Sequence, residues 1–195
     1  MAEALAAVVL VVLGAAASVE AVAAQVVAEV LQVAGKWLNQ MGLTQFYGVY
    51  LKHKFFTDAL LQRLSEAIQA SEQNHAGELV LAIEVQSPKD NLLSHERALE
   101  VFGRLKVWDT PYRTGVLLYL NLSLQTIEII ADRGIEVSNT VWEEVCTQLS
   151  QHLANKDYEK GLQEAIVAIE QVLINACGHL PVNTPNALSD KPVVL

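Results

Sequence analysis

The middle of the chain contains neighbouring runs of apolar residues that predict adjacent β-strands. Residues 116–122 are almost continuously apolar, as expected for a strand that is covered on both faces. Residues 126–131 alternate between two faces, which predicts a half-covered strand. The short stretch 123–125 between them suits a hairpin connection. Another apolar run predicts a further strand over residues 78–86.

Apolar residues at intervals of three and four predict helices on either side of these strands. The first helix is expected to begin at Thr57 or Asp58, either of which can cap its first turn. The second helix covers residues 93–108, with Leu99 on its buried side and Arg97 on its solvent-exposed side.

The third helix is predicted to begin with the capping-box spacing of Thr140 to Glu143, and the fourth to cover residues 158–176. A strand, a helix and a strand in succession form a right-handed parallel crossover, and the hairpin adds an antiparallel strand. The predicted fold class is therefore α/β, a three-layer sandwich with helices flanking a small mixed sheet.

Composition divides the chain into four segments. Residues 1–34 form an apolar, Ala- and Val-rich helix, and residues 35–56 an aromatic connector punctuated by glycines. Residues 57–181 form the α/β domain, and residues 182–195 an extended tail. The aromatic residues of the connector are expected to pin it to the domain.

The N-terminal helix leaves three interpretations open. Its apolar run, residues 4–19, is shorter than the roughly 20 residues that cross a bilayer, and Glu20 follows it. Packing against the domain or against another copy is slightly favoured over a single membrane anchor, and a cleaved signal is third. The expected partners are thus a protein or a second copy of the chain, with a membrane as the alternative. The expected location is the cytoplasm or the cytoplasmic face of a membrane.

Charge and motifs exclude several functions. A net charge of −9 argues against a nucleic-acid partner, because phosphate binding needs clustered Lys and Arg. Cys146 and Cys177 have neither metal nor disulfide spacing and are expected to be small buried hydrophobes. His75 is expected at the end of the first helix, where a cation favours the helix dipole. The sequence has no Gly-rich phosphate loop, serine nucleophile elbow or zinc-ligand spacing.

Three carboxylates are predicted to lie near one margin of the sheet. Asp109 precedes the central strand, Asp132 ends its antiparallel partner and Glu136 follows. These residues are the candidate metal ligands, because carboxylate oxygens suit Ca²⁺ or Mg²⁺ and such a cation could polarise a phosphoryl oxygen. The favoured interpretation is instead that Asp132 pairs with Arg133 or Arg113 and caps the following turn.

Two further carboxylates, Glu78 and Glu84, flank the first strand on one face. The apolar neighbours of Glu84 could raise its pKa and suit it to general acid catalysis. An ion pair with a residue such as Arg97 is the favoured alternative. Arg113, Arg133 and Glu84 form the candidate binding surface.

Six blocks of the sequence, in this order, resemble the TPM domain family, which is named for thylakoid-lumen, photosystem-repair and levamisole-receptor-modulator members. The blocks are His75–Glu84, Arg97–Phe102, Val107–Thr110, Gly115–Tyr119, Ile129–Ile135 and Trp142. The resemblance is closest to the short bacterial branch and covers residues 55–181, and the tail resembles that branch too. It implies an α/β sandwich with an acidic cleft, divalent-cation binding in some members, and the acid phosphatase activity attributed to the plant lumenal branch.

The chain departs from the family pattern at two places. Arg113 and Thr114 stand where relatives tend to have an Asn pair, and residues 123–125 stand where they have Ala-Asp-Arg. These changes remove oxygen ligands. The favoured hypothesis is a non-catalytic binding or accessory domain that acts through its sheet margin and connector. The alternative is a divalent-metal-dependent acid phosphatase that uses Asp109 and Asp132.

Overall fold

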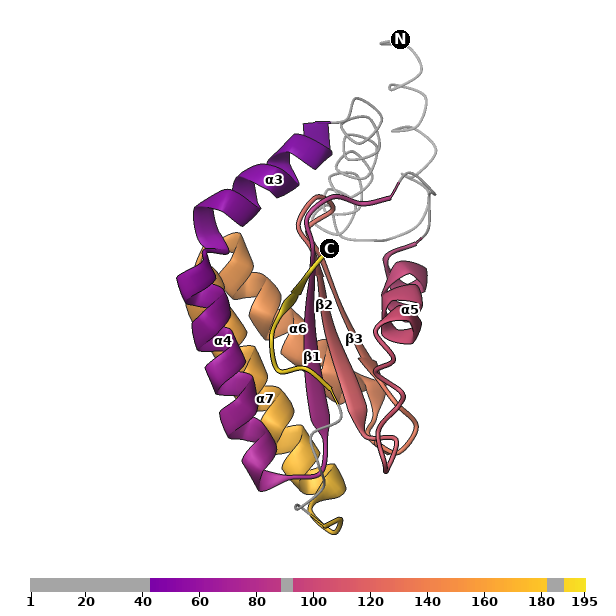
Figure 1. The fold of residues 1–195 in the computed structure, drawn as a ribbon. Coiled ribbons are helices and arrows are strands. Elements are labelled where there is room, and N and C mark those ends of the chain that lie inside the picture. The colour runs from indigo at the N-terminus through magenta and orange to yellow at the C-terminus, as the bar shows by residue number, and fades with distance from the viewer. Residues whose placement is uncertain (1–42, 89–92, 182–187) are drawn as a thin grey trace, which may run out of the picture. The chain divides into compact units, whose positions relative to one another are not determined.

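One mixed sheet of four strands forms the centre of the computed structural model, in the order β3-β2-β1-β4 (Figure 1). β1 and β2 are parallel, β3 is antiparallel to β2, and β4 is parallel to β1. The predicted crossover and hairpin are therefore confirmed. The strands are β1 (Glu78–Glu84), β2 (Gly115–Asn121), β3 (Thr126–Ala131) and β4 (Val193–Val194).

The structure describes residues 43–88, 93–181 and 188–195. The α-helices of these stretches are α3 (Leu43–Phe55), α4 (Asp58–Ser71), α5 (Ser94–Arg104), α6 (Asn139–Ala154) and α7 (Tyr158–Cys177). None of them is both long and apolar enough to span a bilayer. Residues 43–55, which the sequence places in the connector, form α3, and one compact unit of the chain runs from Thr44 to Leu195. The helix predicted over residues 1–34 lies outside the described residues.

Two apolar cores lie on opposite faces of the sheet, because successive strand residues point in opposite directions. On one face Leu81 and Leu118 pack against residues of α4, α6 and α7. On the other face Val80 and Leu117 pack against residues of α5. Figure 1 shows α5 on one side of the sheet and α4, α6 and α7 on the opposite side. All residues of β1 and β2 are buried, as their apolar runs predict.

Side-chain caps fix the starts of two helices. Thr57 caps α4, as predicted, because its Oγ1 accepts from the backbone N–H of Leu60 at 3.3 Å. The capping box predicted at Thr140 is wrong. Ser138 caps α6, and its Oγ accepts from the N–H of Thr140 at 3.4 Å. Ser138 has extended backbone angles, whereas Thr140 already lies in the first helical turn.

The buried side of α5 differs from the prediction. Leu99 is 47% exposed, whereas Arg97 is only 9% exposed. Ala98 and Val101 pack on the sheet instead. The physical reason is a buried acidic partner, Glu84, which orients this face of α5 and compensates the charge of Arg97.

The C-terminal tail adds a strand that the sequence pattern did not predict. The N–H of Leu195 donates to the carbonyl oxygen of Ile83 at 2.9 Å, and the N–H of Val85 donates to that of Leu195 at 3.1 Å. A strand of two residues is too short for a periodic pattern. Its docking by residues 193–195 agrees with the predicted extended tail.

Candidate functional site

The carboxyl ends of β1 and β2 place buried polar side chains between the sheet and α5. Glu84 ends β1, and Arg97 of α5 donates to it from Nε at 3.1 Å and from Nη2 at 2.5 Å. Arg97 also donates to Glu100 at 2.6 Å. The bonds to Glu84 are the main reason that the pKa of Arg97 lies above its ordinary value. The predicted ion pair is therefore confirmed, and the wet position predicted for Arg97 is wrong.

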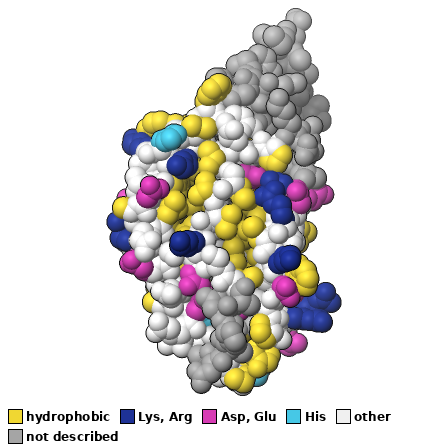
Figure 2. All heavy atoms as spheres, viewed as in Figure 1, with side chains coloured by type: hydrophobic (Ala, Val, Ile, Leu, Met, Phe, Trp, Pro, Cys, Tyr) yellow, Lys and Arg dark blue, Asp and Glu magenta, His cyan; other side chains and the backbone are white. Residues whose placement is uncertain are grey.

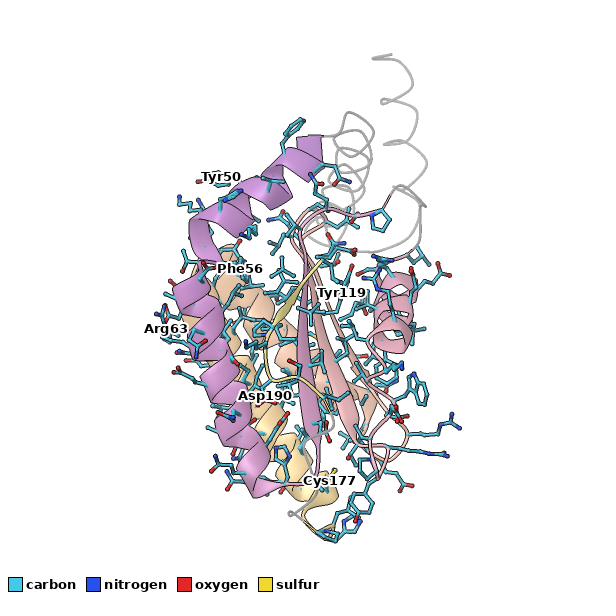
Figure 3. All side chains as sticks on the ribbon, viewed as in Figure 1. Tyr50, Phe56, Arg63, Tyr119, Cys177 and Asp190 are labelled. Atoms are coloured by element: carbon cyan, nitrogen blue, oxygen red, sulfur yellow. The ribbon has the colours of Figure 1, made fainter. Side chains whose placement is uncertain are left out.

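Tyr119 of β2 completes this buried group. Its hydroxyl donates to Glu84 Oε2, and Figure 3 shows the ring between the sheet and α5. Burial and the bond to Glu84 raise the pKa of Tyr119, so the hydroxyl remains protonated and remains a donor. Both oxygens of Glu84 thus accept hydrogen bonds from within the fold.

A chain of hydrogen bonds continues from Tyr119 to α3. Asn121 Nδ2 donates to the Tyr119 hydroxyl at 3.1 Å and to Ser87 Oγ at 2.7 Å, and Ser123 Oγ donates to Asn121 Oδ1 at 2.9 Å. The carbonyl oxygen of Ser87 accepts from Gln45 Nε2 of α3 at 2.8 Å. We call these hydrogen-bonded residues the strand-end network; its members are Glu84, Ser87, Arg97, Tyr119, Asn121 and Ser123.

Sequence reasoning missed most of the strand-end network. It anticipated Glu84 and Arg97 but not Tyr119 or Asn121. The pairing of β1 with β2 aligns Glu84 with Asn121, and that register is a tertiary feature. The one local signal was a polar residue, Asn121, at the end of an otherwise apolar strand.

The opposite margin of the sheet contains Asp132, the first residue after β3. Its backbone N–H donates to the carbonyl oxygen of Gly115 at 2.9 Å, which places it at the start of the central strand, as predicted. Its Oδ1 accepts from the N–H of Arg133 at 2.8 Å and caps the turn. Its Oδ2 is buried and has no hydrogen-bond partner. Within the described residues, no ion pair joins Asp132 to either predicted arginine.

The other predicted site residues lie at the surface. Asp109, Glu136, Arg113 and Arg133 are all exposed. Over residues 43–88, 93–181 and 188–195, no group of three or more His, Cys, Asp or Glu side chains is arranged to hold a metal ion. The predicted ligands therefore do not form a cage that fits Ca²⁺ or Mg²⁺, and metal binding by them stays a prediction.

A further group of carboxylates, of which the sequence analysis named only Glu78, lies next to the C-terminal tail. Glu72 Oε1 accepts from the N–H of Leu79 at 2.9 Å, and Glu78 Oε2 accepts from the N–H of Leu188 at 2.7 Å. Burial, with smaller contributions from Asp190 and Glu78, raises the pKa of Glu72 to about 8. Glu72 is therefore mostly protonated at neutral pH. Glu72 and Asp190 are 118 positions apart, and no local pattern connects them.

His75 and the two cysteines have no exposed reactive group. His75 is buried, its Nδ1 accepts from the N–H of Gly77 at 3.1 Å, and burial lowers its pKa. The predicted helix-dipole cation is wrong, because an imidazolium here would be desolvated. Cys177 is buried and Cys146 is half-buried, and burial raises the pKa of the Cys146 thiol to about 11. Both cysteines act mainly as hydrophobes.

Comparison with known proteins identifies the family. The sequence model of the TPM domain matches residues 49–172. The chain belongs to the TPM domain family. The NMR structure of BA42 protein from the psychrophilic bacterium Bizionia argentinensis sp. nov. is similar, with a TM-score of 0.63 and 23% sequence identity. The similarity covers 73% of this chain and 97% of that one, and at this identity it shows the fold alone. No curated protein matches the chain.

The TPM domain also presents an aromatic face on α3, which we define as Phe46, Tyr47 and Tyr50. These side chains are 74%, 40% and 51% exposed. Lys54 lies on the same helix face, donates to the Tyr50 hydroxyl at 2.8 Å and stands 5.3 Å from the centre of the Tyr50 ring. Figure 2 shows hydrophobic side chains beside a His and basic side chains over α3, and Figure 3 shows Tyr50 on the outer side of the helix.

The opposite face of α3 packs against the rest of the domain. Leu51 and the following Phe56 are buried, and Phe55 is half-buried. The predicted pinning by aromatic residues is confirmed for Phe55 and Phe56. It is wrong for the three residues of the aromatic face, because helical periodicity turns them away from the core.

Proposed function

We propose that this TPM domain is a non-catalytic binding or accessory domain that docks a protein partner through the aromatic face of α3. The observation that supports it is the exposure of Phe46, Tyr47 and Tyr50 on one side of a helix. Large aromatic side chains are enriched at the centres of protein interfaces, where burying them contributes most of the binding energy. Three exposed aromatic side chains on one side of α3 could therefore form the centre of such an interface.

The charge next to the aromatic face indicates the chemistry of the partner. The last turn of α3 contains Lys52, His53 and Lys54, in a chain whose net charge is −9. A partner surface with apolar pockets for the rings and carboxylates opposite these bases would be complementary. The acidity of the whole chain disfavours an anionic lipid surface relative to such a protein.

The strand-end network supports a binding role over acid–base catalysis. Glu84 is buried, and Arg97 and Tyr119 occupy both of its oxygens. A carboxylate that is held in this way stabilises the junction of β1, β2 and α5. It has no free oxygen to deliver a proton to a substrate.

The test is site-specific photo-cross-linking of the full chain in its native cells. A photoreactive amino acid at position 50 is expected to yield a cross-linked product with one protein. The same group at position 112, an exposed tyrosine outside α3, is the matched control and is expected to yield none. The purified partner should then bind at least tenfold more weakly to Phe46→Ser and Tyr50→Ser variants.

Three results would contradict this proposal. The same cross-linked products in equal yield from positions 50 and 112 would show that the aromatic face of α3 is not a specific docking surface. A homodimer as the sole product would assign the aromatic face to self-association. Recovery of the chain with neutral lipid vesicles, lost in the Tyr50→Ser variant, would assign it to a membrane surface.

A divalent-metal-dependent phosphatase is the second candidate function. The matched family model has the name TPM phosphatase, and Asp132 Oδ2 is a buried carboxylate oxygen without a hydrogen-bond partner. This candidate assigns Ca²⁺ or Mg²⁺ to Asp109, Asp132 and Glu136, although no group of three or more such side chains in the described part of the chain is arranged to hold a metal ion.

Hydrolysis of a generic phosphomonoester decides between the two functions. Under the binding proposal, purified protein shows no turnover above background with added Mg²⁺ or Ca²⁺. Robust turnover that both Asp109→Asn and Asp132→Asn abolish, while Glu143→Gln on the exposed side of α6 does not, would establish the phosphatase.

A further inference from the structure

A pocket of about 240 Å³ lies inside the compact unit, between α3, the β2–β3 hairpin and the α6–α7 turn. Leu51 of α3, Ile127 of β3 and Leu153 of α6 form parts of its wall. The complete lining is Leu51, Leu120, Asn121, Leu122, Gln125, Thr126, Ile127, Ser150, Leu153, Ala154 and Tyr158. None of the three residues of the aromatic face lines the pocket, although α3 contributes to both, and burial together with the nearby Tyr47 raises the pKa of Tyr158.

The lining of the pocket is mainly apolar and carries no charged side chain. Seven of its eleven residues are Leu, Ile, Ala or Tyr, and none is charged. Most of the polar lining groups are already used. Asn121 belongs to the strand-end network, Thr126 accepts from Ser94 at 2.7 Å, and Ser150 donates to the helix backbone at 2.7 Å. A charged ligand would find no opposite charge on this wall, whereas an uncharged apolar body would be well covered.

The exception is the hydroxyl of Tyr158. Only 5% of the residue is exposed, and among the described residues its hydroxyl has no hydrogen-bond partner, although the hydroxyl oxygen itself is not fully buried. Its ring is held by Phe55, stacked at 4.4 Å between ring centres, and by Phe56, edge-on at 5.4 Å. These two rings restrict the movement of the Tyr158 side chain. A hydroxyl that has no partner among the described residues and that solvent can reach is available to a ligand group.

We propose that this pocket binds a small, uncharged and mainly apolar molecule that exchanges a hydrogen bond with the Tyr158 hydroxyl. The volume sets the size of the ligand. A cavity of roughly 150 Å³ with apolar walls holds benzene, so 240 Å³ suits a ring system or short chain somewhat larger than benzene. Indole has this size, is neutral and has one polar N–H, which the hydroxyl oxygen can accept.

The experiment is a titration of the full ¹⁵N-labelled chain with indole, followed by NMR. Saturable shifts are expected in the amide signals of Leu51, Ile127 and Leu153. Tyr158→Phe keeps the stacked ring and removes only the hydroxyl, so it should weaken binding about three- to tenfold. Tyr112→Phe makes the same chemical change at an exposed tyrosine and should leave the affinity unchanged. Indole-3-carboxylate should bind at least tenfold more weakly than indole.

Several outcomes overturn the proposal. They are the absence of saturable shifts, shifts that map away from the pocket wall, equal affinity of Tyr158→Phe and the natural chain, and equal affinity for the carboxylate. The Tyr50→Ser variant separates this inference from the docking proposal. It should lose the partner and still bind indole, because Tyr50 lies outside the pocket lining.

Discussion

At the scale of single residues, the most consequential contact is the buried pair of Glu84 and Arg97. Both side chains are almost inaccessible, and Tyr119 adds a third member. Desolvation opposes burial of either charge, so the pair is tolerated only because each charge compensates the other. Removing one member therefore has a larger effect than removing both.

We expect Arg97→Met to lower the free energy of unfolding by about 3–5 kcal/mol, because it leaves the Glu84 carboxylate buried without its cation. The double variant Glu84→Leu, Arg97→Met should recover at least half of the loss. Urea unfolding at pH 7 measures both, and Arg104→Met on the exposed side of α5 is the control. A loss below about 1 kcal/mol for Arg97→Met would show that the pair is not effectively buried.

Glu72 makes the stability of the folded chain depend on pH. Its pKa is about 8 in the folded chain, against an ordinary value of 4.5. Between these values the folded state keeps a proton that the unfolded state has lost. The contribution of Glu72 to stability is therefore full below about pH 4.5 and falls as pH rises towards 8.

We expect Glu72→Gln to remove this fall, because the amide can still accept from Leu79 but has no proton to lose. The variant should be similar to the natural chain at pH 5 and roughly 2–4 kcal/mol more stable at pH 8.5. Thermal unfolding at a series of pH values measures the difference. Glu66→Gln, at an exposed carboxylate on α4, should give parallel curves, and a parallel curve for Glu72→Gln would refute the assignment.

At the scale of elements, α3 decides how the proposed docking surface is presented. The Gln45 side chain donates a hydrogen bond to the carbonyl oxygen of Ser87, in the loop after β1. Gly48 lies directly against the carbonyl oxygen of Val85 in the same loop. A Cβ at position 48 would overlap that oxygen. The absence of a side chain at Gly48 therefore allows α3 to seat closely on the loop that follows β1.

We expect Gly48→Ala to displace α3 and to destabilise the domain by about 1–3 kcal/mol, although alanine favours helices. Hydrogen exchange of residues 49–55 should accelerate at the same time. Gly103→Ala is the matched control, because that helical glycine has open space around it and should gain about 0.5–1 kcal/mol. Unchanged exchange in Gly48→Ala would show that α3 is not held by this contact.

At the scale of the whole molecule, the chain divides into residues 1–43 and a compact unit, residues 44–195. The Ala- and Val-rich sequence of residues 1–34 is too apolar to remain in water alone. We therefore expect it to be covered by the domain, by another chain or by a membrane.

We expect a chain shortened to begin at Gly42 to fold and to stay soluble and monomeric, because it retains the whole compact unit. The full chain should self-associate or require detergent. Size-exclusion chromatography with light scattering compares the two. A monomeric full chain together with an aggregating short chain would place residues 1–34 in the domain's own core.

The order and type of the elements followed from sequence because they depend on local periodicity. The continuous apolar runs of β1 and β2, the alternation of β3 and the threonine cap of α4 are properties of neighbouring residues. The family also followed from sequence, because six separate blocks occur in the right order. The candidate site followed only in part, through the pairing of Glu84 with Arg97.

Tertiary structure decided the rest because it brings together residues that no local pattern connects. The parallel register of β1 and β2 set Asn121 beside Glu84, and the rotation of α5 exposed Leu99 while it buried Arg97. The pairing of β4, the raised pKa of Glu72 and the pocket at Tyr158 likewise depend on distant segments. Burial and register are properties of the packed chain, so side chains that lack a local signal acquire their roles only when the sheet and helices have assembled.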